Sequence, residues 1–339
     1  MPKVSVLMSV YNGEKFLAEA VKSILNQTFK DFEFVIIDDG STDRSLQILQ
    51  QFSDKRIRLL QNEQNKGLVY SLNRGLEECY GEYIVRMDAD DIANQHRLDL
   101  QVSKMDESPD VVLLGSSFHM FYYKSFISKR ISPLNDTERV KTRLLFQNAI
   151  AHPTTIIRAK TMKENELFYD EEHKYAEDYG LWNKLASYGE ITNLQEPLLQ
   201  YRLVSNSQTA RGKRDEKERL AIYNKIVSIP LSRLNIDVEN NGIHFELAEA
   251  HNLKQLQYKL EDYKEYLSKL MKANELTKVY HHDRFKEECA SQFYRCCLVF
   301  GDYEAYNQHF YQITPISSFQ FKMDQLQFKA KKRVKKLVR

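Results

Sequence analysis

Two acidic clusters in the first hundred residues each follow a short apolar run. The first spans residues 38–43 (Asp-Asp-Gly-Ser-Thr-Asp) and the second spans residues 88–91 (Asp-Ala-Asp-Asp). Ligands of open α/β sheets bind at the carboxyl ends of the strands. Carboxylates gathered there are suited to hold a divalent cation together with the phosphate groups that it accompanies. The sequence therefore predicts an enzyme that handles an activated, phosphate-bearing small molecule.

The second cluster is a candidate metal site. Residues two apart in an extended segment point the same way, so we expect Asp88 and Asp90 to share one side and Asp91 to face away. Two converging carboxylates repel each other unless a cation joins them, and Mn²⁺ or Mg²⁺ takes such oxygen ligands. We therefore assign Asp90 and Asp88 to a site for Mn²⁺ or Mg²⁺. The structural alternative is that these acids cap a helix beginning near Ile92, and we give that role to Asp91.

One aspartate of the first cluster is a candidate ligand for a nucleotide base. The glycine allows a tight turn and the three residues after it can cap the next helix, which explains most of this cluster structurally. We expect Asp39, at the crest of the sheet, to accept an N–H from a base. Turns carrying Ser9, Tyr11 and Asn65 expose backbone and one flat ring near the same crest, although each alone is more often an ordinary turn.

A third acidic pair, Glu177 and Asp178, opens a predicted helix. The helix dipole favours acids in a first turn whatever their function, which is the structural explanation. A general base for an acceptor hydroxyl also needs a carboxylate at the mouth of the site. Both explanations stay open from these residues alone.

Strand and helix patterns alternate over the first 120 residues. We predict strands at residues 4–9, 33–38, 57–61, 83–86 and 111–118, and helices at residues 16–26, 45–52, 68–79 and 92–105. Such alternation implies a mostly parallel sheet covered by helices on both faces. The mixed region that follows is predicted to hold helices at 138–146 and 177–188 and extended runs at 154–158 and 197–203. After a polar linker at 207–219 the rest is predicted to be helical, at residues 217–229, 253–271, 283–299 and 317–338.

Composition limits the function classes. The 339 residues are 42% hydrophobic, enough to bury a sizeable core. The last eleven residues carry seven Lys or Arg and no acid, and subtracting those seven charges from the formal +2 leaves −5. A body with net negative charge argues against nucleic acid as the main partner.

The cysteines and the apolar stretches bear on location. The four cysteines lack zinc-site spacing, which predicts reduced thiols in a cytosolic protein. No apolar stretch approaches the ~18 residues of a membrane span.

The motifs occur in a familiar order. Residues 4–12, 38–43, 65–67 with 72–75, 88–91 and 177–178 together resemble the family 2 glycosyltransferases of GT-A fold. The resemblance covers about residues 3–205. It implies the α/β fold of nucleotide-diphospho-sugar transferases, with a mostly parallel mixed sheet between helices. It does not cover the all-helical C-terminal region that follows. We expect a GT-A domain at residues 1–206, a helical domain at 207–328 and a basic amphipathic tail at 329–339.

The resemblance implies a reaction and a donor site. The enzyme would move one sugar from a UDP-sugar to an acceptor hydroxyl and invert the anomeric carbon. Asp39 would receive the uracil N–H, while Ser9 and Tyr11 would line the base and ribose beside Asn65. Asp88 would lie near the ribose or the metal. Asp90 would bind the metal that holds the diphosphate.

On the acceptor side, the resemblance makes Asp178 the base that deprotonates the hydroxyl. His152 looks similar to a family position beside the acceptor pocket, with a core histidine as the alternative. We place Glu177, Trp182 and Arg202 on this side too, although Arg202 could instead approach the diphosphate. The displacement passes through an oxocarbenium-like state, for which one base and one cation suffice. A retaining reaction would need a nucleophilic carboxylate, and no residue stands out as one.

The sequence departs from the processive members of this family. Their Q-x-x-R-W motif is replaced by Gln-Tyr-Arg-Leu at residues 200–203, and no membrane span is seen, which predicts one sugar per acceptor. In the predicted last helix an apolar stripe opposes Lys and Arg residues, as in helices that lie on anionic membranes. The alternative is a solvated or nucleic-acid-adhesive tail. Bacterial relatives often act at the inner leaflet. We therefore expect a saccharide or polyprenyl-diphosphate-linked saccharide as acceptor, in O-antigen or capsule synthesis, by a cytoplasmic protein peripheral to the inner membrane.

Two other functions are the alternatives to a sugar transferase. An inactive sugar-nucleotide-binding scaffold of the same fold would lose its base or metal ligand, yet Asp90 and Asp178 are both present. A sugar-phosphate nucleotidyltransferase needs a glycine-rich, basic first loop. The loop at residues 9–14 (Ser-Val-Tyr-Asn-Gly-Glu) has neither property. The sequence therefore favours the transferase.

Overall fold

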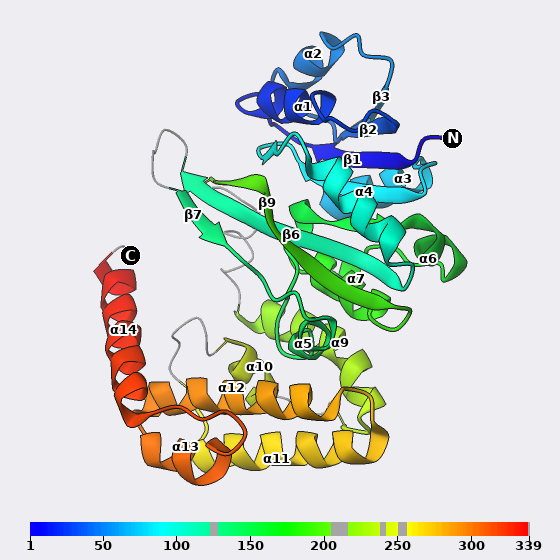
Figure 1. Ribbon diagram of the computed structural model, residues 1–339. Coiled ribbons are helices and arrows are strands. Elements are labelled where there is room, and N and C mark those ends of the chain that lie inside the picture. Colours follow the sequence, from blue (N-terminus) through cyan, green and yellow to red (C-terminus); the bar gives the residue numbers. More distant parts are fainter. Residues whose placement is uncertain (123–127, 205–215, 238–241, 250–255, 338–339) are drawn as a thin grey trace. The chain divides into compact units, whose positions relative to one another are not determined.

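The computed structural model describes residues 1–122, 128–204, 216–237, 242–249 and 256–337 (Figure 1). The chain forms two compact units. The first consists of Met1–Val140 and Asn148–Ile222, and the second consists of Lys141–Gln147 and Tyr223–Arg339. Within the described residues, no helix has the length and apolar character needed to cross a membrane.

The first unit is built on one mixed sheet. Its described strands run in the order β3-β2-β1-β4-β8-β6-β9-β5, with β7 paired to β6. The first four in the chain are mutually parallel: β1 (Val4–Val10), β2 (Phe32–Asp38), β3 (Ile57–Gln61) and β4 (Tyr83–Asp88). The others are β5 (Ile92–Ala93), β6 (Val111–Tyr122), β7 (Ser128–Ile131), β8 (Ile156–Arg158) and β9 (Glu190–Leu203). Strand β8 is antiparallel to its neighbours β4 and β6, whereas β9 is parallel to β6.

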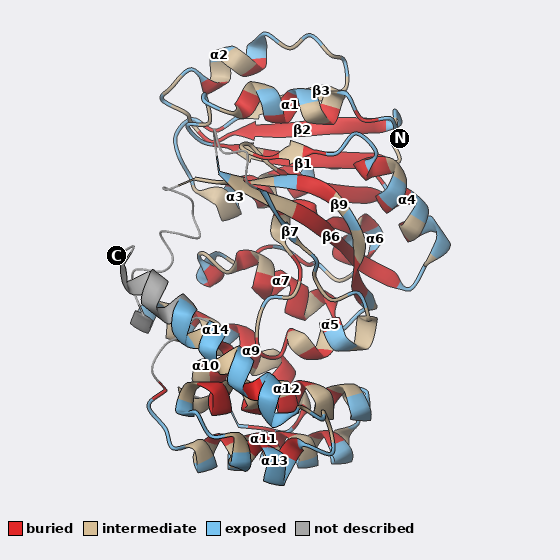
Figure 2. Cartoon of the chain, turned by 60° about the vertical axis from the view of Figure 1, so that its left-hand side comes forward, coloured by how far each residue is buried: buried red, intermediate tan, exposed pale blue. Residues whose placement is uncertain are grey.

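Helices cover both faces of the parallel strands, as the alternation of patterns predicts. All seven residues of β2 are buried, which is typical of strands covered on both sides (Figure 2). Val6 and Met8 of β1 share one core with α1 (Leu17–Leu25) and α4 (Arg97–Glu107). Leu7 points to the other face, where a Cβ on Gly75 of α3 (Leu68–Glu77) would lie 2.2 Å from its Cδ1. Glycine therefore lets α3 pack closely on β1.

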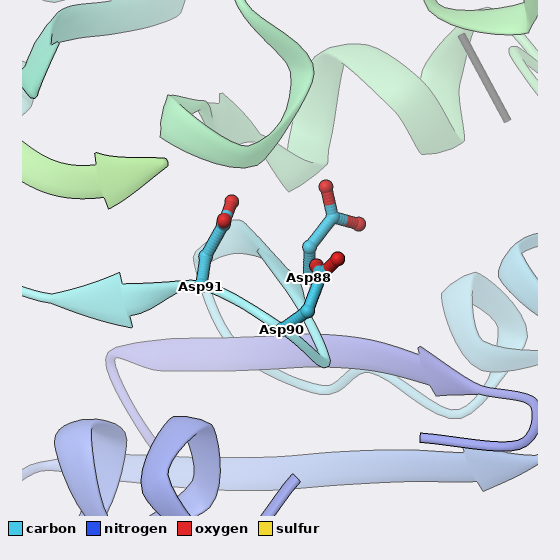
Figure 3. Close-up of side chains that lie close together, drawn as sticks. All are labelled: Asp88, Asp90 and Asp91. Carbon is cyan, nitrogen blue, oxygen red and sulfur yellow. The ribbon is translucent and has the colours of Figure 1, made fainter. Parts of the chain in front are cut away.

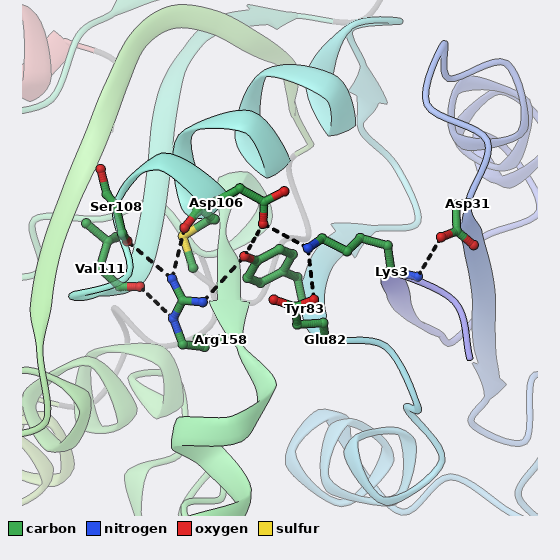
Figure 4. A network of polar contacts seen from close by, with 9 residues as sticks. Lys3, Asp31, Glu82, Tyr83, Asp106, Ser108, Val111 and Arg158 are labelled. Atoms are coloured by element: carbon green, nitrogen blue, oxygen red, sulfur yellow. Dashed lines mark hydrogen bonds and ion pairs between the residues drawn. The ribbon is translucent and has the colours of Figure 1, made fainter.

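An ionic network ties together the amino ends of these strands, away from the acidic clusters (Figure 4). Lys3 lies 2.9 Å from the carboxylates of both Glu82 and Asp106. Tyr83 donates its hydroxyl to Asp106, and Arg158 donates to the Met105 carbonyl at 3.0 Å. The network joins the start of β1, the start of β4, the end of α4 and β8.

The predicted helix at 92–105 is wrong at its start. Ile92 and Ala93 form strand β5, which pairs with Gln200 and Leu199 of β9, and α4 begins only at Arg97. The backbone N–H of Asn94 continues this pairing by donating to the Leu198 carbonyl. A partner strand about a hundred residues away thus overrides the local helical pattern.

Three further helices follow the predicted order with shifted ends: α2 (Ser45–Gln50), α5 (Thr137–Arg143), whose last three residues belong to the second unit, and α7 (Glu177–Leu185). Helix α6 (Ala159–Glu164), strand β7 and the 3₁₀ turns His152–Thr154 and Glu171–His173 are not among the predicted elements. Residues 207–215 of the predicted linker lie outside the described residues.

The second unit is helical, as expected. It contains most of α9 (Glu216–Arg233), followed by α10 (Gly242–Glu249), α11 (Leu260–Thr277), α12 (His282–Phe300), α13 (Tyr303–Phe310) and α14 (Ser318–Leu337). Helices α10 and α13 were not predicted, and α11 begins seven residues later than the predicted 253. The Lys259 N–H donates to the Asp262 carboxylate and caps α11 there. All four cysteines are buried free thiols.

Candidate active site

The sheet brings the two acidic clusters to one edge. Strand β1 lies between β2 and β4, and in this register Val10 is opposite Asp38 while Ser9 is opposite Asp88. Both clusters therefore follow strands that flank β1, at their carboxyl ends. This is the arrangement that the sequence predicts.

Three carboxylates of the second cluster converge. Asp88, Asp90 and Asp91 each offer an oxygen within 4.8 Å of the others (Figure 3). The expectation that Asp91 faces away and caps a helix is wrong, because the chain turns after Asp88 and continues into β5. Asp91 is 1% exposed, and its Oδ1 accepts the backbone N–H of Arg202 at 2.8 Å. Its Oδ2 is buried without a hydrogen-bond partner.

The electrostatics of this cluster suit a divalent cation. Burial and the charge of Asp88 raise the pKa of Asp90 to about 6. Burial and the charges of Asp88 and Asp90 raise the pKa of Asp91 well above its ordinary value. A hard cation with oxygen ligands relieves such repulsion and gives the unpartnered oxygen of Asp91 a ligand role. The residues present therefore fit Mn²⁺ or Mg²⁺.

Two buried arginines surround the cluster. Arg86, which sequence reasoning missed, is 2% exposed and places Nη2 2.6 Å from Asp88 Oδ1. An arginine inside the apolar strand β4 was the available signal. Arg202 donates to the Asp90 carbonyl at 2.7 Å and lies 2.6 Å from the Glu19 carboxylate, with its guanidinium over the Phe16 ring. Arg202 is thus part of the wall that holds the 90–91 turn.

The carboxylate of Asp39 holds the turn at residues 65–67, which precedes α3. This carboxylate is 2% exposed and accepts the backbone N–H groups of Lys66 and Gly67, each at 2.9 Å, and the side-chain amide of Asn62. Asn65 in this turn is exposed. Ser9, near the end of β1, is half-buried, and Tyr11, just beyond the strand, is 46% exposed. Ser9, Tyr11, Asp39 and Asn65 thus lie at or just beyond the carboxyl ends of the neighbouring strands β1, β2 and β3.

Asp178 is held by two donors at the start of α7. Its Oδ2 accepts the side-chain amide of Asn148 at 2.8 Å, and its Oδ1 accepts the N–H of Tyr179 at 2.7 Å. Burial raises the pKa of Asp178 to about 6. Burial and the charge of Asp178 raise the pKa of Glu177 to about 7. The charge of Asp88 raises the pKa of both acids, so the third acidic pair lies within electrostatic reach of the second cluster.

His152 and Trp182 lie together beside this acidic pair. His152 is half-buried, and its Nε2 lies 2.8 Å from the hydroxyl of Tyr169. Burial and the charge of Arg86 lower its pKa well below the ordinary value, so the ring is neutral. Trp182 has no exposed surface, packs edge-on against His152 and donates to the Ile150 carbonyl. Trp182 therefore packs against His152 from the interior of the protein.

Gly40, in the first acidic cluster, allows the backbone at Gln64 to approach closely. This close approach gives a stability prediction. Gly40 has φ +65°, and a Cβ there would lie 2.5 Å from the Gln64 backbone. Gly40→Ala is expected to cost about 2–3 kcal/mol of unfolding free energy through strain and displacement of the 65–67 turn. Gly67→Ala is the matched control, since Gly67 also has positive φ but a Cβ there meets nothing within 4 Å. Chemical denaturation checks this, and equal losses for the two variants would contradict the steric explanation.

Comparison with known proteins gives a family match over the same strands. The family model described as "Glycosyl transferase family 2" matches residues 5–164. An uncharacterized glycosyltransferase of Haemophilus influenzae is 32% identical over 250 residues, 70% of this chain and 77% of the relative. The putative glycosyltransferase EpsE of Bacillus subtilis is 34% identical over 216 residues, 62% of this chain and 77% of EpsE.

Two further relatives extend the comparison. Escherichia coli WfgD, named as a UDP-Glc:α-D-GlcNAc-diphosphoundecaprenol β-1,3-glucosyltransferase, is 27% identical over 233 residues, 68% of this chain and 89% of WfgD. The crystal structure of S. aureus TarS 1–349 in complex with UDP-GlcNAc matches with a TM-score of 0.57 at 22% identity. That match covers 91% of this chain and 92% of the TarS chain, and it shows the fold.

Proposed function

Because this chain belongs to the family 2 glycosyltransferases of GT-A fold, we propose that it transfers one sugar from a UDP-sugar to an acceptor hydroxyl with inversion. One observation carries the proposal. Three carboxylates converge within 4.8 Å at the carboxyl edge of the sheet. The third acidic pair, in which Asn148 donates to Asp178, lies within electrostatic reach of them. A metal–diphosphate site and a separate base are the parts that inversion needs.

The donor is proposed to be a UDP-sugar. The name of WfgD gives UDP-Glc as its donor, and TarS was solved with UDP-GlcNAc. A carboxylate has about four lone-pair sites, and the carboxylate of Asp39 uses three for Asn62, Lys66 and Gly67. We assign the remaining site to the uracil N–H. Ser9, Tyr11 and Asn65 would line the base and ribose.

Asp90 and Asp88 would hold Mn²⁺ or Mg²⁺, with the unpartnered Oδ2 of Asp91 as a further ligand. When bound, the cation neutralises charge that develops on the leaving diphosphate. Arg86 orients Asp88 through its 2.6 Å ion pair. Arg202 keeps the 90–91 turn in place by donating to the Asp90 carbonyl.

Asp178 is proposed to take the proton of the attacking hydroxyl. Its two hydrogen bonds fix the carboxylate, and they leave lone pairs for the acceptor. Neutral His152 and Glu177 would contact the acceptor sugar, with Trp182 supporting His152 from behind. No nucleophilic carboxylate is required, because a single displacement inverts the anomeric carbon.

The acceptor is proposed to be a lipid-linked saccharide of bacterial polysaccharide synthesis. The name of WfgD gives a diphosphoundecaprenol-linked acceptor. Helix α14 supports a membrane location: Phe319, Met323 and Leu326 lie on one face and are 72%, 41% and 62% exposed. Phe321 on another face is 3% exposed and packs against Tyr294. Residues 329–337 of the predicted basic tail belong to this helix, although the side chains of residues 331–339 lie outside the described residues.

A donor panel tests the proposed function. Purified protein with Mn²⁺ is offered a set of UDP-sugars, and UDP release is measured with and without EDTA. We expect slow hydrolysis of one donor that EDTA abolishes, which also identifies the sugar. If no donor releases UDP, a sugar-nucleotide-binding scaffold would explain the same fold better.

Membrane binding gives a separate prediction. Leu326→Ser removes an exposed apolar side chain worth about 2 kcal/mol on burial, so binding to anionic vesicles should weaken about 30-fold. Leu276→Ser is the matched control, because Leu276 is 85% exposed on α11 and belongs to no such stripe. Vesicle co-sedimentation at low and high salt measures both. Equal binding of the two variants, or equal binding to zwitterionic vesicles, would contradict the membrane proposal.

A further inference from the structure

A buried tyrosine of the first unit contacts the side chain of His152, which belongs to the same unit. The Tyr169 hydroxyl lies 2.8 Å from His152 Nε2, and the two ring centroids are 5.3 Å apart. Burial, with a contribution from the charges of Asp178 and Glu177, raises the pKa of this hydroxyl, so it keeps its proton. Among the described residues, His152 Nε2 is the only hydrogen-bond partner of the hydroxyl.

The direction of this hydrogen bond follows from the chemistry of the two groups. A tyrosine hydroxyl has one hydrogen to donate, and a buried hydroxyl whose hydrogen finds no acceptor is destabilising. The Tyr169 hydroxyl therefore donates, and His152 Nε2 accepts. Burial and the charge of Arg86 lower the pKa of His152, so its ring is neutral and carries a single N–H. That hydrogen is consequently on Nδ1.

The Nδ1–H group of His152 is not used by the protein itself. Nδ1 has no hydrogen-bond partner in the part of the chain that the structure describes, and it is not one of the buried polar atoms that lack a partner there. Because His152 is half-buried, this nitrogen reaches the surface of the unit. His152 thus offers one N–H donor to a molecule bound beside it.

The position of Tyr169 is set by Asn73 of α3. The Asn73 amide donates to the Tyr169 carbonyl at 2.8 Å, and the Asn73 Oδ1 accepts the Tyr169 N–H at 3.0 Å. These two bonds satisfy both backbone polar groups of one residue. Helix α3 itself packs closely on β1 at Gly75. The clamp therefore ties Tyr169 to a rigid element of the sheet unit, as the support of a binding group requires.

His152 also stands near the proposed base. Trp182 packs edge-on against His152 with centroids 5.7 Å apart. Asp178 and Trp182 are four residues apart in α7, so they lie on one face of this helix. The imidazole is therefore close to the turn of α7 that carries Asp178. A carboxylate that can take a proton and an N–H that can donate one hydrogen bond lie on the same side of the site.

We propose that Tyr169, clamped by Asn73, holds His152 as the Nδ1–H tautomer, so that this N–H donates to an oxygen of the acceptor saccharide. Asp178 would take the proton of the attacking hydroxyl, and His152 would bind a neighbouring oxygen of the same sugar. A sugar ring carries oxygens on adjacent carbons and meets both requirements, whereas a simple alcohol meets only one. The proposal rests on the proposed function, in which His152 contacts the acceptor. Tyr169 and Asn73 are positioning residues, because neither is placed against substrate.

Nuclear magnetic resonance of the full chain labelled with ¹⁵N-histidine tests the tautomer, since the ring C–H protons report on both ring nitrogens. The chain has nine histidines, and the signals that disappear in His152→Gln belong to His152. At neutral pH we expect a protonated Nδ1 and an unprotonated Nε2. Tyr169→Phe removes the donor to Nε2, so the Nε2–H tautomer should become populated. Asn73→Ala should move the signals in the same direction.

Tyr83→Phe is the matched control for the lost hydroxyl. Tyr83 is another buried tyrosine of the first unit, and it donates to Asp106 at the opposite end of the strands. This variant should leave the His152 signals where they are. An Nε2–H tautomer in the unchanged protein, or equal spectra for Tyr169→Phe and Tyr83→Phe, would overturn the positioning of His152.

UDP release in the presence of added sugars tests the acceptor contact. The probes are the methyl glycosides of glucose, galactose and their N-acetyl forms, and the gain is measured over each variant's own release with water. At least one glycoside should give a gain, which Tyr169→Phe should reduce about three- to tenfold through loss of one neutral hydrogen bond, and which Tyr83→Phe should keep. An equal gain in Tyr169→Phe, or no gain from any glycoside, would overturn the contact with the acceptor. If no UDP-sugar is hydrolysed at all, the proposed function is wrong, while the NMR result still decides the positioning of His152.

Discussion

Asp178→Asn is expected to lower sugar transfer about 10²–10⁴-fold while leaving the dissociation constant for UDP unchanged. The amide has nearly the shape of the carboxylate, so the fold of α7 should persist, but an amide cannot take a proton from the acceptor. UDP release from the active donor measures turnover, and calorimetric titration with UDP measures binding. An inactive scaffold would show no change in either.

Glu177→Gln is the matched control, because it neutralises the adjacent acid of the same helical turn and leaves the base in place. With water as the acceptor it should keep most of the UDP release, because the proposed contact of Glu177 is with the acceptor sugar. The pH profile of the unchanged protein gives a second check. Below a pKa of about 6 Asp178 is protonated and cannot accept a proton, so activity should fall about tenfold per pH unit there and level off above it. If Glu177→Gln abolished UDP release and Asp178→Asn kept it, the base would be Glu177 and not Asp178.

Asp90→Ala is expected to remove the metal-dependent part of both UDP binding and transfer. A cation that stabilises a leaving diphosphate contributes several kcal/mol, so we expect a loss of about 10³-fold in transfer. Without metal the three carboxylates repel one another, so the variant should unfold at a higher temperature than the unchanged protein in EDTA. Thermal unfolding with Mn²⁺ and with EDTA measures this directly.

Asp110→Ala is the control for the metal experiment, since Asp110 is exposed just before β6, away from the acidic cluster. It should keep the rise in unfolding temperature that Mn²⁺ gives. If Mn²⁺ raised the unfolding temperature of Asp90→Ala as much as that of the unchanged protein, the cation would bind elsewhere.

The family and the parallel half of the sheet could be predicted because their signals are local. Strand β2 is apolar from Phe34 to Ile37, and each acidic cluster begins at the last residue of its strand, so strand order alone gathers the clusters. The relatives confirm the family that these motifs predict. The boundaries at 206 and 328 remain predictions, although the chain is seen to divide into two units, one of them mostly helical.

What could not be predicted depends on contacts between distant residues. The position of Asp91 is set by the backbone of Arg202 in β9, more than a hundred residues away in the sequence. The donor to Asp178, Asn148, has no motif and is found only through a contact 30 residues apart. Helices α10 and α13 are each only eight residues long, and such short segments give weak periodicity.

The most direct test of inversion by a single base is the stereochemistry of donor hydrolysis, followed by proton NMR. Water serves as the acceptor, so the natural acceptor need not be known. With Mn²⁺ and an α-linked UDP-sugar, the β anomer of the free sugar should appear first, before mutarotation mixes the two forms, and Asp178→Asn should release neither anomer. Release of the α anomer first would contradict inversion by a single base and would instead require a nucleophilic side chain at the donor site.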